Sequence, residues 1–64
     1  MRGAVATFGD DGWGLIHGED GFEHPFHSTA IADGSRTIAV GTDVRFELVP
    51  GRQGRWEAAA ISPI

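Results

Sequence analysis

The feature that most constrains the fold is the regular spacing of turn sequences along a chain of only 64 residues. Clusters of glycine with aspartate or proline recur about every eight to twelve residues, and they favour turns because glycine tolerates positive φ and aspartate caps its own backbone. Short strands separated by such turns are typical of a small closed all-β barrel. The five predicted strands cover residues 2–8, 13–17, 23–27, 43–48 and 56–61.

The segment at 43–48 has the clearest strand pattern. Val44, Phe46 and Leu48 alternate with three charged residues, which is typical of a strand with one buried face. We therefore predict that Phe46 is fully buried. The segment at 56–61 is less clear, because its residues 57–60 favour helix by intrinsic propensity, but the sheet pattern of the whole chain favours a strand. Residues 28–31 predict a short helical turn.

Size and composition indicate one small domain, which we place over residues 1–64. A domain of this length buries only about 60% of the surface of its unfolded chain, so we expect modest stability. The chain has no cysteine and therefore neither a disulfide nor a thiolate metal site. It also has no long apolar run and no charged-then-apolar leader, and we expect a cytoplasmic protein that does not enter a membrane.

The charge balance is acidic, since nine acidic residues oppose five basic ones, all arginine, and the net charge is -4. Nucleic-acid-binding proteins usually have a basic balance, because phosphate neutralisation supplies most of their non-specific affinity. A nucleic-acid site in this chain must therefore depend on interactions other than a broad positive field.

A tryptophan between two glycines, in the stretch 12–16, is the strongest candidate for a binding residue. Strand side chains alternate between faces, so Trp13 and Leu15 share one face and Ile16 lies on the other. In the next strand the same alternation separates Pro25 and His27 from the predicted core residue Phe26. An exposed Trp beside glycines can stack on another planar group. The alternative is that Trp13 packs inward and the glycines mark bulges.

Several stretches resemble the bacterial cold-shock domain family in order and spacing, namely residues 1–8 (MRGAVATF), 12–16 (GWGLI) and 23–31 (EHPFHSTAI). Later segments at 33–38, 44–48 and 51–54 also fit, with about one deletion near Ala32 and one insertion near Arg55, so the resemblance spans nearly the whole chain. It implies a five-stranded antiparallel barrel of the oligonucleotide/oligosaccharide-binding (OB) type. In that fold the second and third strands carry the ligand, which here would be single-stranded RNA or DNA, with no cofactor.

The resemblance also implies which residues bind. Trp13 and Phe8 stand at family phenylalanines that stack on bases, and His27 stands at the family histidine. Smaller residues occupy other family phenylalanine positions, and arginines with a second tryptophan can compensate, since guanidinium planes also stack on bases. The predicted nucleic-acid-binding residues are Phe8, Trp13, Leu15, Pro25, His27, Ser28, Arg36, Arg55 and Trp56. For Trp56 the alternative is a structural role in closing the bottom of the barrel.

Further departures from the family pattern predict weaker binding than in typical members. Thr7 stands where the family has Trp, Asp11 and Ala6 stand where it has Lys, and Ser35 stands at the loop Phe. Each lost stack removes about 1–3 kcal/mol per base. The expected function is therefore a weak single-strand-binding RNA chaperone or regulator of gene expression.

The sequence also allows functions other than nucleic-acid binding. The main alternative is a barrel whose apolar patch of Trp13, Leu15 and Pro25 binds another protein. A metal site would need His24 and His27 together, but alternation places them on opposite faces of a strand. No exposed nucleophile pairs with a base, so we do not expect an enzyme. We expect a monomer, with a dimer as the alternative.

Overall fold

The computed structural model describes residues 1–51 and 54–64, and in them every predicted strand is present. The end of the predicted second strand moves by one residue, and the fourth and fifth strands run two residues further than predicted. The predicted helical turn is a single turn of 3-10 helix. The elements are β1 (Arg2–Phe8), β2 (Trp13–Gly18), β3 (Glu23–His27), η1 (Ser28–Ala30), β4 (Asp43–Pro50) and β5 (Trp56–Pro63).

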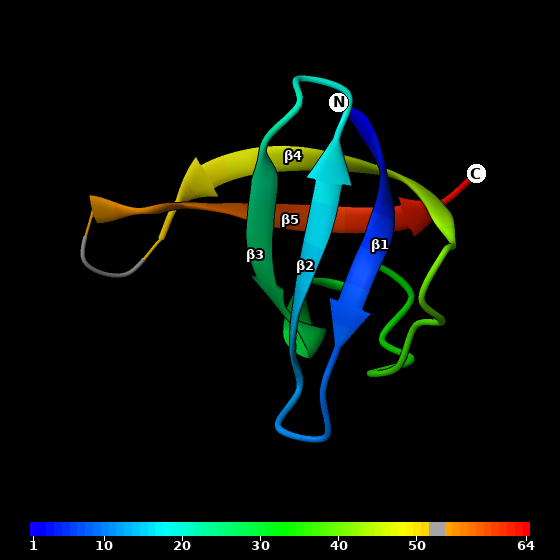
Figure 1. Cartoon of the computed structure of the whole chain (residues 1–64). Helices are drawn as coiled ribbons and strands as arrows, with labels where there is room; N and C mark the ends of the chain where they lie inside the picture. The colour runs from blue at the N-terminus through cyan, green and yellow to red at the C-terminus, as the bar shows by residue number, and fades with distance from the viewer. Residues whose placement is uncertain (52–53) are drawn as a thin grey trace.

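The strands form one antiparallel sheet in the order β3-β2-β1-β4-β5. Figure 1 shows β4 and β5 crossing behind β1, β2 and β3 at a steep angle, so the sheet folds back on itself. The two ends of the sheet then approach each other, with a parallel bridge between Ile31 and Ile61 and a 2.8 Å hydrogen bond from the Ala32 N–H to the Ile61 carbonyl. The strands thus enclose a single core.

Among the described residues, no helix is long or apolar enough to cross a membrane.

Alternation along the strands supplies the core. Phe46 is 2% exposed, which confirms the prediction for the segment at 43–48. In the last strand, pairing overrides helix propensity because it buries Ala58 opposite Leu48 and brings Ile61 into the core. The buried cluster consists of Val5, Ile16, Phe26, Val44, Phe46, Ala58 and Ile61.

A bulge in β1 decides where the end of that strand points. Val5 pairs with Ile16 and Thr7 pairs with Leu15, so one extra residue lies between them in β1. Without this residue the alternation would put Phe8 on the opposite face from Val5. With it, Phe8 turns to the core side, where its ring stacks on Phe26 at a centroid distance of 5.9 Å and an interplanar angle of 10°.

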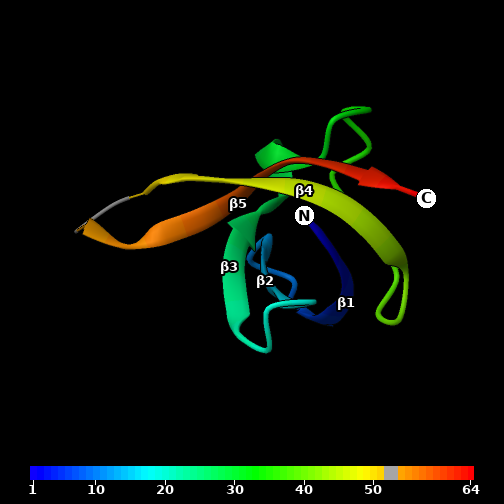
Figure 2. The ribbon, with the colours of Figure 1, turned by 90° about the horizontal axis from the view of Figure 1, so that it is seen from above.

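The hairpin of β4 and β5 projects beyond the edge of the barrel, as Figure 2 shows from above. In its ladder Leu48 pairs with Ala58 and Pro50 pairs with Trp56. The first pair covers the core, whereas the second lies further out and is exposed. The apolar side of this hairpin therefore continues past the body of the protein.

Candidate nucleic-acid interface

The register of β2 and β3 places the predicted binding residues of these strands on one face. Trp13 pairs with His27 and Leu15 pairs with Pro25. Residues directly opposite each other in a ladder point to the same side, so these four side chains form one outward surface, which we call the stacking face. The residues between them, Ile16 and Phe26 among others, point inward and are buried.

Trp13 and His27 form the centre of the stacking face. Their ring centroids lie 4.9 Å apart and the rings are inclined by 70°, an edge-to-face arrangement favoured by the charge distribution of aromatic rings. Trp13 remains 40% exposed. This exposure excludes the alternative in which Trp13 packs into the core.

The His27 ring is held by the turn that follows it. Its Nδ1 accepts a hydrogen bond from the Thr29 N–H at 3.3 Å and lies 3.1 Å from Thr29 Oγ1. His27 thereby caps η1. An Nδ1 that accepts from a backbone N–H carries no proton, so the neutral ring bears its hydrogen on Nε2. The cap therefore fixes both the tautomer and the orientation of the imidazole beside Trp13.

The two glycines beside Trp13 are each required by a different ring. Gly12 has φ +84, and a Cβ there would lie 3.1 Å from His27 Nε2 and 3.2 Å from Ser28 Oγ. A Cβ on Gly14 would lie 2.7 Å from the Phe26 ring. Glycine at these positions thus lets the His27 ring approach on the outside and the Phe26 ring on the inside. The planar groups that use this space belong to the protein itself.

Carboxylates surround the exposed indole. Asp11 accepts the Trp13 N–H at 3.0 Å in a local turn, which fixes its charge at the start of β2. On the other side Glu57 of β5 lines a shallow hollow together with Trp13, His27 and Thr29. The charge of Asp11 beside the indole opposes an approaching phosphate.

Ser28 is buried and does not lie on the stacking face, so its contact with nucleic acid stays a prediction. The residue is only 8% exposed. Its N–H donates to the Gly12 carbonyl at 2.7 Å as η1 begins, and this bond turns the side chain under Gly12. The resemblance placed Ser28 at a family phenylalanine, but the strand ends at His27 and alternation does not continue to Ser28.

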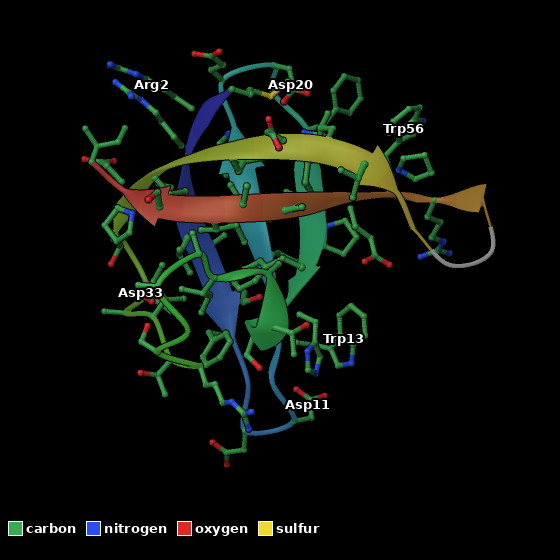
Figure 3. The ribbon with its side chains drawn as sticks, turned by 180° about the vertical axis from the view of Figure 1, so that it is seen from behind. Arg2, Asp11, Trp13, Asp20, Asp33 and Trp56 are labelled. Atoms are coloured by element: carbon green, nitrogen blue, oxygen red, sulfur yellow. The ribbon has the colours of Figure 1, made fainter. Side chains whose placement is uncertain are left out.

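The remaining predicted residues lie away from the stacking face. Phe8 is half-buried against the core and, with Arg36, lines a separate hollow beside the β1–β2 turn. Arg55 and Trp56 lie at the projecting end of the β4–β5 hairpin, and Figure 3 shows Trp56 well separated from Trp13. Trp56 is 59% exposed, so the alternative that it closes the barrel is wrong.

His24 has a structural environment on the opposite side of β3. It is buried, its ring is tilted against Phe46, and its Nε2 lies 2.8 Å from Asp20 Oδ2. Desolvation acts to raise the pKa of Asp20, but the Phe22 N–H and the His24 ring outweigh it and hold the pKa below its usual value. Within residues 1–51 and 54–64, no cluster of three or more His, Cys, Asp or Glu side chains could hold a metal ion.

Sequence reasoning missed two residues of the hollow. The Thr29 contact had a local signal, because a hydroxyl residue two positions after His27 can pair with its ring at a helix start. Glu57 had none, because it reaches the hollow only when β5 lies beside β3.

Comparison with known proteins assigns the fold to a family. Residues 1–64 match the model of the 'Cold-shock' DNA-binding domain. The chain belongs to the cold-shock domain family. The cold shock protein CspB of Bacillus caldolyticus is 40% identical over 63 residues, which cover 95% of this chain and 96% of the relative. The cold shock-like protein CspE of Buchnera aphidicola subsp. Acyrthosiphon pisum is 38% identical over 65 residues, which cover 97% of this chain and 94% of the relative.

Family membership establishes the general role of this cold-shock domain. Its five antiparallel strands form the OB-type barrel of the family, and domains of this kind bind single-stranded nucleic acids without catalysing a reaction. The stacking face lies on β2 and β3, the strands whose surface carries the ligand in OB barrels.

Proposed function

We propose that this cold-shock domain binds unpaired RNA or DNA by stacking bases on Trp13 and His27, and that it acts in the cytoplasm as a weak RNA chaperone or regulator of gene expression. The observation that carries the proposal is the exposed indole of Trp13, held edge-to-face against a ring whose orientation is fixed by a cap. Unpaired bases present flat π-faces, and preorganised planar side chains bind them with little loss of entropy.

The weakness of binding follows from the neighbours of this pair. Leu15 and Pro25 continue the stacking face with apolar area but without π-faces, so bases that reach them gain only desolvation. Each missing aromatic removes about 1–3 kcal/mol, and Asp11 adds repulsion of the phosphates. Affinity therefore depends on one strong stacking position.

Arg36, Arg55 and Trp56 would act as outlying contacts. Arg36 lines the hollow next to Phe8 and can pair with a phosphate or stack on a base there. Arg55 and Trp56 on the projecting hairpin can take a base beyond the body of the barrel. These positions extend a bound strand but do not replace Trp13.

Fluorescence titration with oligo-dT and oligo-rU at low salt tests the proposal. A Trp56→Phe variant leaves Trp13 as the sole indole, so quenching in that variant reports on the stacking face. Trp13→Ala is then compared with wild type by anisotropy of a labelled oligonucleotide, and we expect affinity to fall about 5- to 150-fold, as one lost stack predicts. Unchanged affinity in Trp13→Ala would exclude the stacking face as the site.

A protein-binding role is the second candidate. It is favoured by the apolar pair Leu15 and Pro25 beside Trp13, and by the carboxylate of Asp11, which opposes phosphates but not a peptide. The same titration discriminates, because this role predicts no quenching of Trp13 by either oligonucleotide.

A further inference from the structure

Two arginines lie side by side at the end of the barrel opposite the β1–β2 turn. Arg2 of β1 pairs directly with Arg45 of β4, and paired residues of antiparallel strands have their Cα atoms about 4.5–5.5 Å apart. Both side chains are exposed, and Figure 3 shows Arg2 pointing away from the sheet. The two guanidinium groups thus leave the sheet on the same side as neighbours.

These arginines lie on the same side of the sheet as the stacking face. Thr7 pairs with Leu15 of that face, and beyond the bulge Ala4 pairs with His17. Arg2 precedes Ala4 by two residues and therefore points the same way. About six residues of strand separate the levels of Trp13 and Arg2, or about 20 Å at 3.3 Å per residue. A single surface thus has an aromatic end and a cationic end.

The arginine pair lacks partners among residues 1–51 and 54–64. Neither side chain makes a hydrogen bond or an ion pair there. Glu19 and Asp43 line the hollow beside Arg2 but lie outside ion-pair distance. Like charges directly opposite each other on neighbouring strands destabilise a sheet. A bound oxyanion between the two guanidinium groups would offset this repulsion.

We propose that Arg2 and Arg45 form an oxyanion site that holds a backbone phosphate of the strand whose bases stack on Trp13. The proposal rests on the proposed function, because it takes the same ligand. Each guanidinium presents a planar fork of N–H donors that matches two phosphate oxygens. Asp11 beside Trp13 repels phosphates, whereas the Arg2 and Arg45 pair attracts them, so the strand is anchored by bases at one end and by phosphate at the other.

The remaining described arginines do not offer an equivalent site. Arg36 lies beside Phe8 and Arg55 lies on the projecting hairpin, and neither has an arginine partner in a strand ladder. This difference supplies the matched comparison. Arg55→Gln removes the same charge from the protein as Arg45→Gln, but it leaves the cross-strand pair intact.

The experiment measures oligo-dT affinity against salt for wild type, Arg2→Gln, Arg45→Gln and the double variant. Each single change should weaken binding about 3- to 10-fold at low salt. The double variant should lose little more affinity than either single variant, because both arginines bind the same phosphate. The slope of log K against log salt should fall by about 0.7, the value for one phosphate of a single strand. When Arg55→Gln is combined with Arg2→Gln, the losses in binding free energy should instead add.

Thermal unfolding gives a second measurement that needs no oligonucleotide. Sulfate stands in for the phosphate, and it is compared with chloride at equal ionic strength. We expect sulfate to raise the Tm of wild type and of Arg55→Gln more than that of Arg45→Gln. Equal sulfate effects in all three proteins would overturn the oxyanion site.

The outcomes separate this inference from the proposed function. If Trp13→Ala loses affinity while the Arg2 and Arg45 variants bind like wild type, stacking stands and the oxyanion site is wrong. If oligonucleotides do not bind but sulfate stabilisation depends on Arg45, the proposed function fails, and with it the assignment of the bound anion to a nucleic-acid strand.

Discussion

Side chains of β2 and β3 point alternately inward and outward, and the two sides differ in how strictly the structure constrains their residues. The inward side is continuous and tightly specified: Ile16 and Phe26 are buried, and Gly14 is required by the Phe26 ring. On the outward side a single aromatic pair, Trp13 and His27, lies beside aliphatic residues and carboxylates. Core packing restricts the identity of each inward residue, whereas the outward residues are constrained only by what they bind. The fold can therefore persist while the binding site changes.

The sharpest test of this contrast is a change on the inward side. Phe26→Ala should cost about 3–5 kcal/mol, because it removes a fully buried ring from the core. A domain of this size has only about 3–10 kcal/mol of stability in total, so the variant should be largely unfolded by circular dichroism. Phe26→Leu should remain folded with a lowered Tm. A cooperative Phe26→Ala protein with the Tm of wild type would contradict the account of the core.

The adjacent outward residue should give the opposite result. His27→Ala should weaken oligonucleotide binding about 5- to 150-fold through the lost ring. It should cost only about 1 kcal/mol of stability, the typical value of a helix cap. Denaturant unfolding and anisotropy on the same sample check both expectations. A loss of stability as large as that of Phe26→Ala would erase the contrast between the two sides.

Asp11→Asn should sharpen the electrostatic part of the contrast. The amide oxygen can still accept the Trp13 N–H, so the local turn is kept while one negative charge beside the indole is removed. We expect affinity for oligo-dT to rise about two- to fivefold at low salt, with the gain fading at high salt as charges are screened. A gain that is independent of salt would point to a change in the turn rather than in the charge.

The smallest expected effect is the pH dependence of stability that arises from Asp20, the partner of the inward His24. The pKa of Asp20 lies below its ordinary value in the folded protein, so ionised Asp20 favours folding. This contribution is present above the unfolded pKa of about 3.9 and is lost as the pH falls through the folded pKa. In Asp20→Asn the Tm should therefore fall less steeply than in wild type below about pH 4. Parallel curves for the two proteins would count against this role of Asp20.

The inward side was predicted well from the sequence because the periodicity of apolar residues indicates which side chains are buried. Val44 and Phe46 alternate with charged residues, and the resemblance to cold-shock domains implied the five-stranded antiparallel barrel. The helix-prone residues 57–60 were correctly predicted as strand only because the whole pattern was taken together. Local propensity is weak beside the pairing that buries Ala58.

The outward side was predicted less completely, and its ligand contacts remain predictions. Alternation predicts that Trp13 and Leu15 share a face and that Pro25 and His27 share a face, but their pairing comes from the register, and the position of Phe8 depends on a bulge that no local signal marks. Ser28 lies off the stacking face because η1 begins immediately after His27. Glu57 and the Arg2 and Arg45 pair come from strands that are distant in sequence, so only the folded sheet brings them together.

The bulge in β1 also determines how this surface can be rebuilt. Because one extra residue follows Val5, the ring of Phe8 stacks on Phe26 on the core side. Replacing Phe8 would therefore remove a packing contact rather than add a binding contact. Thr7 is the exposed neighbour, opposite Leu15. An engineer who wishes to enlarge the aromatic surface should therefore graft a ring at Thr7, where the barrel already offers an open position and nothing in the interior has to move.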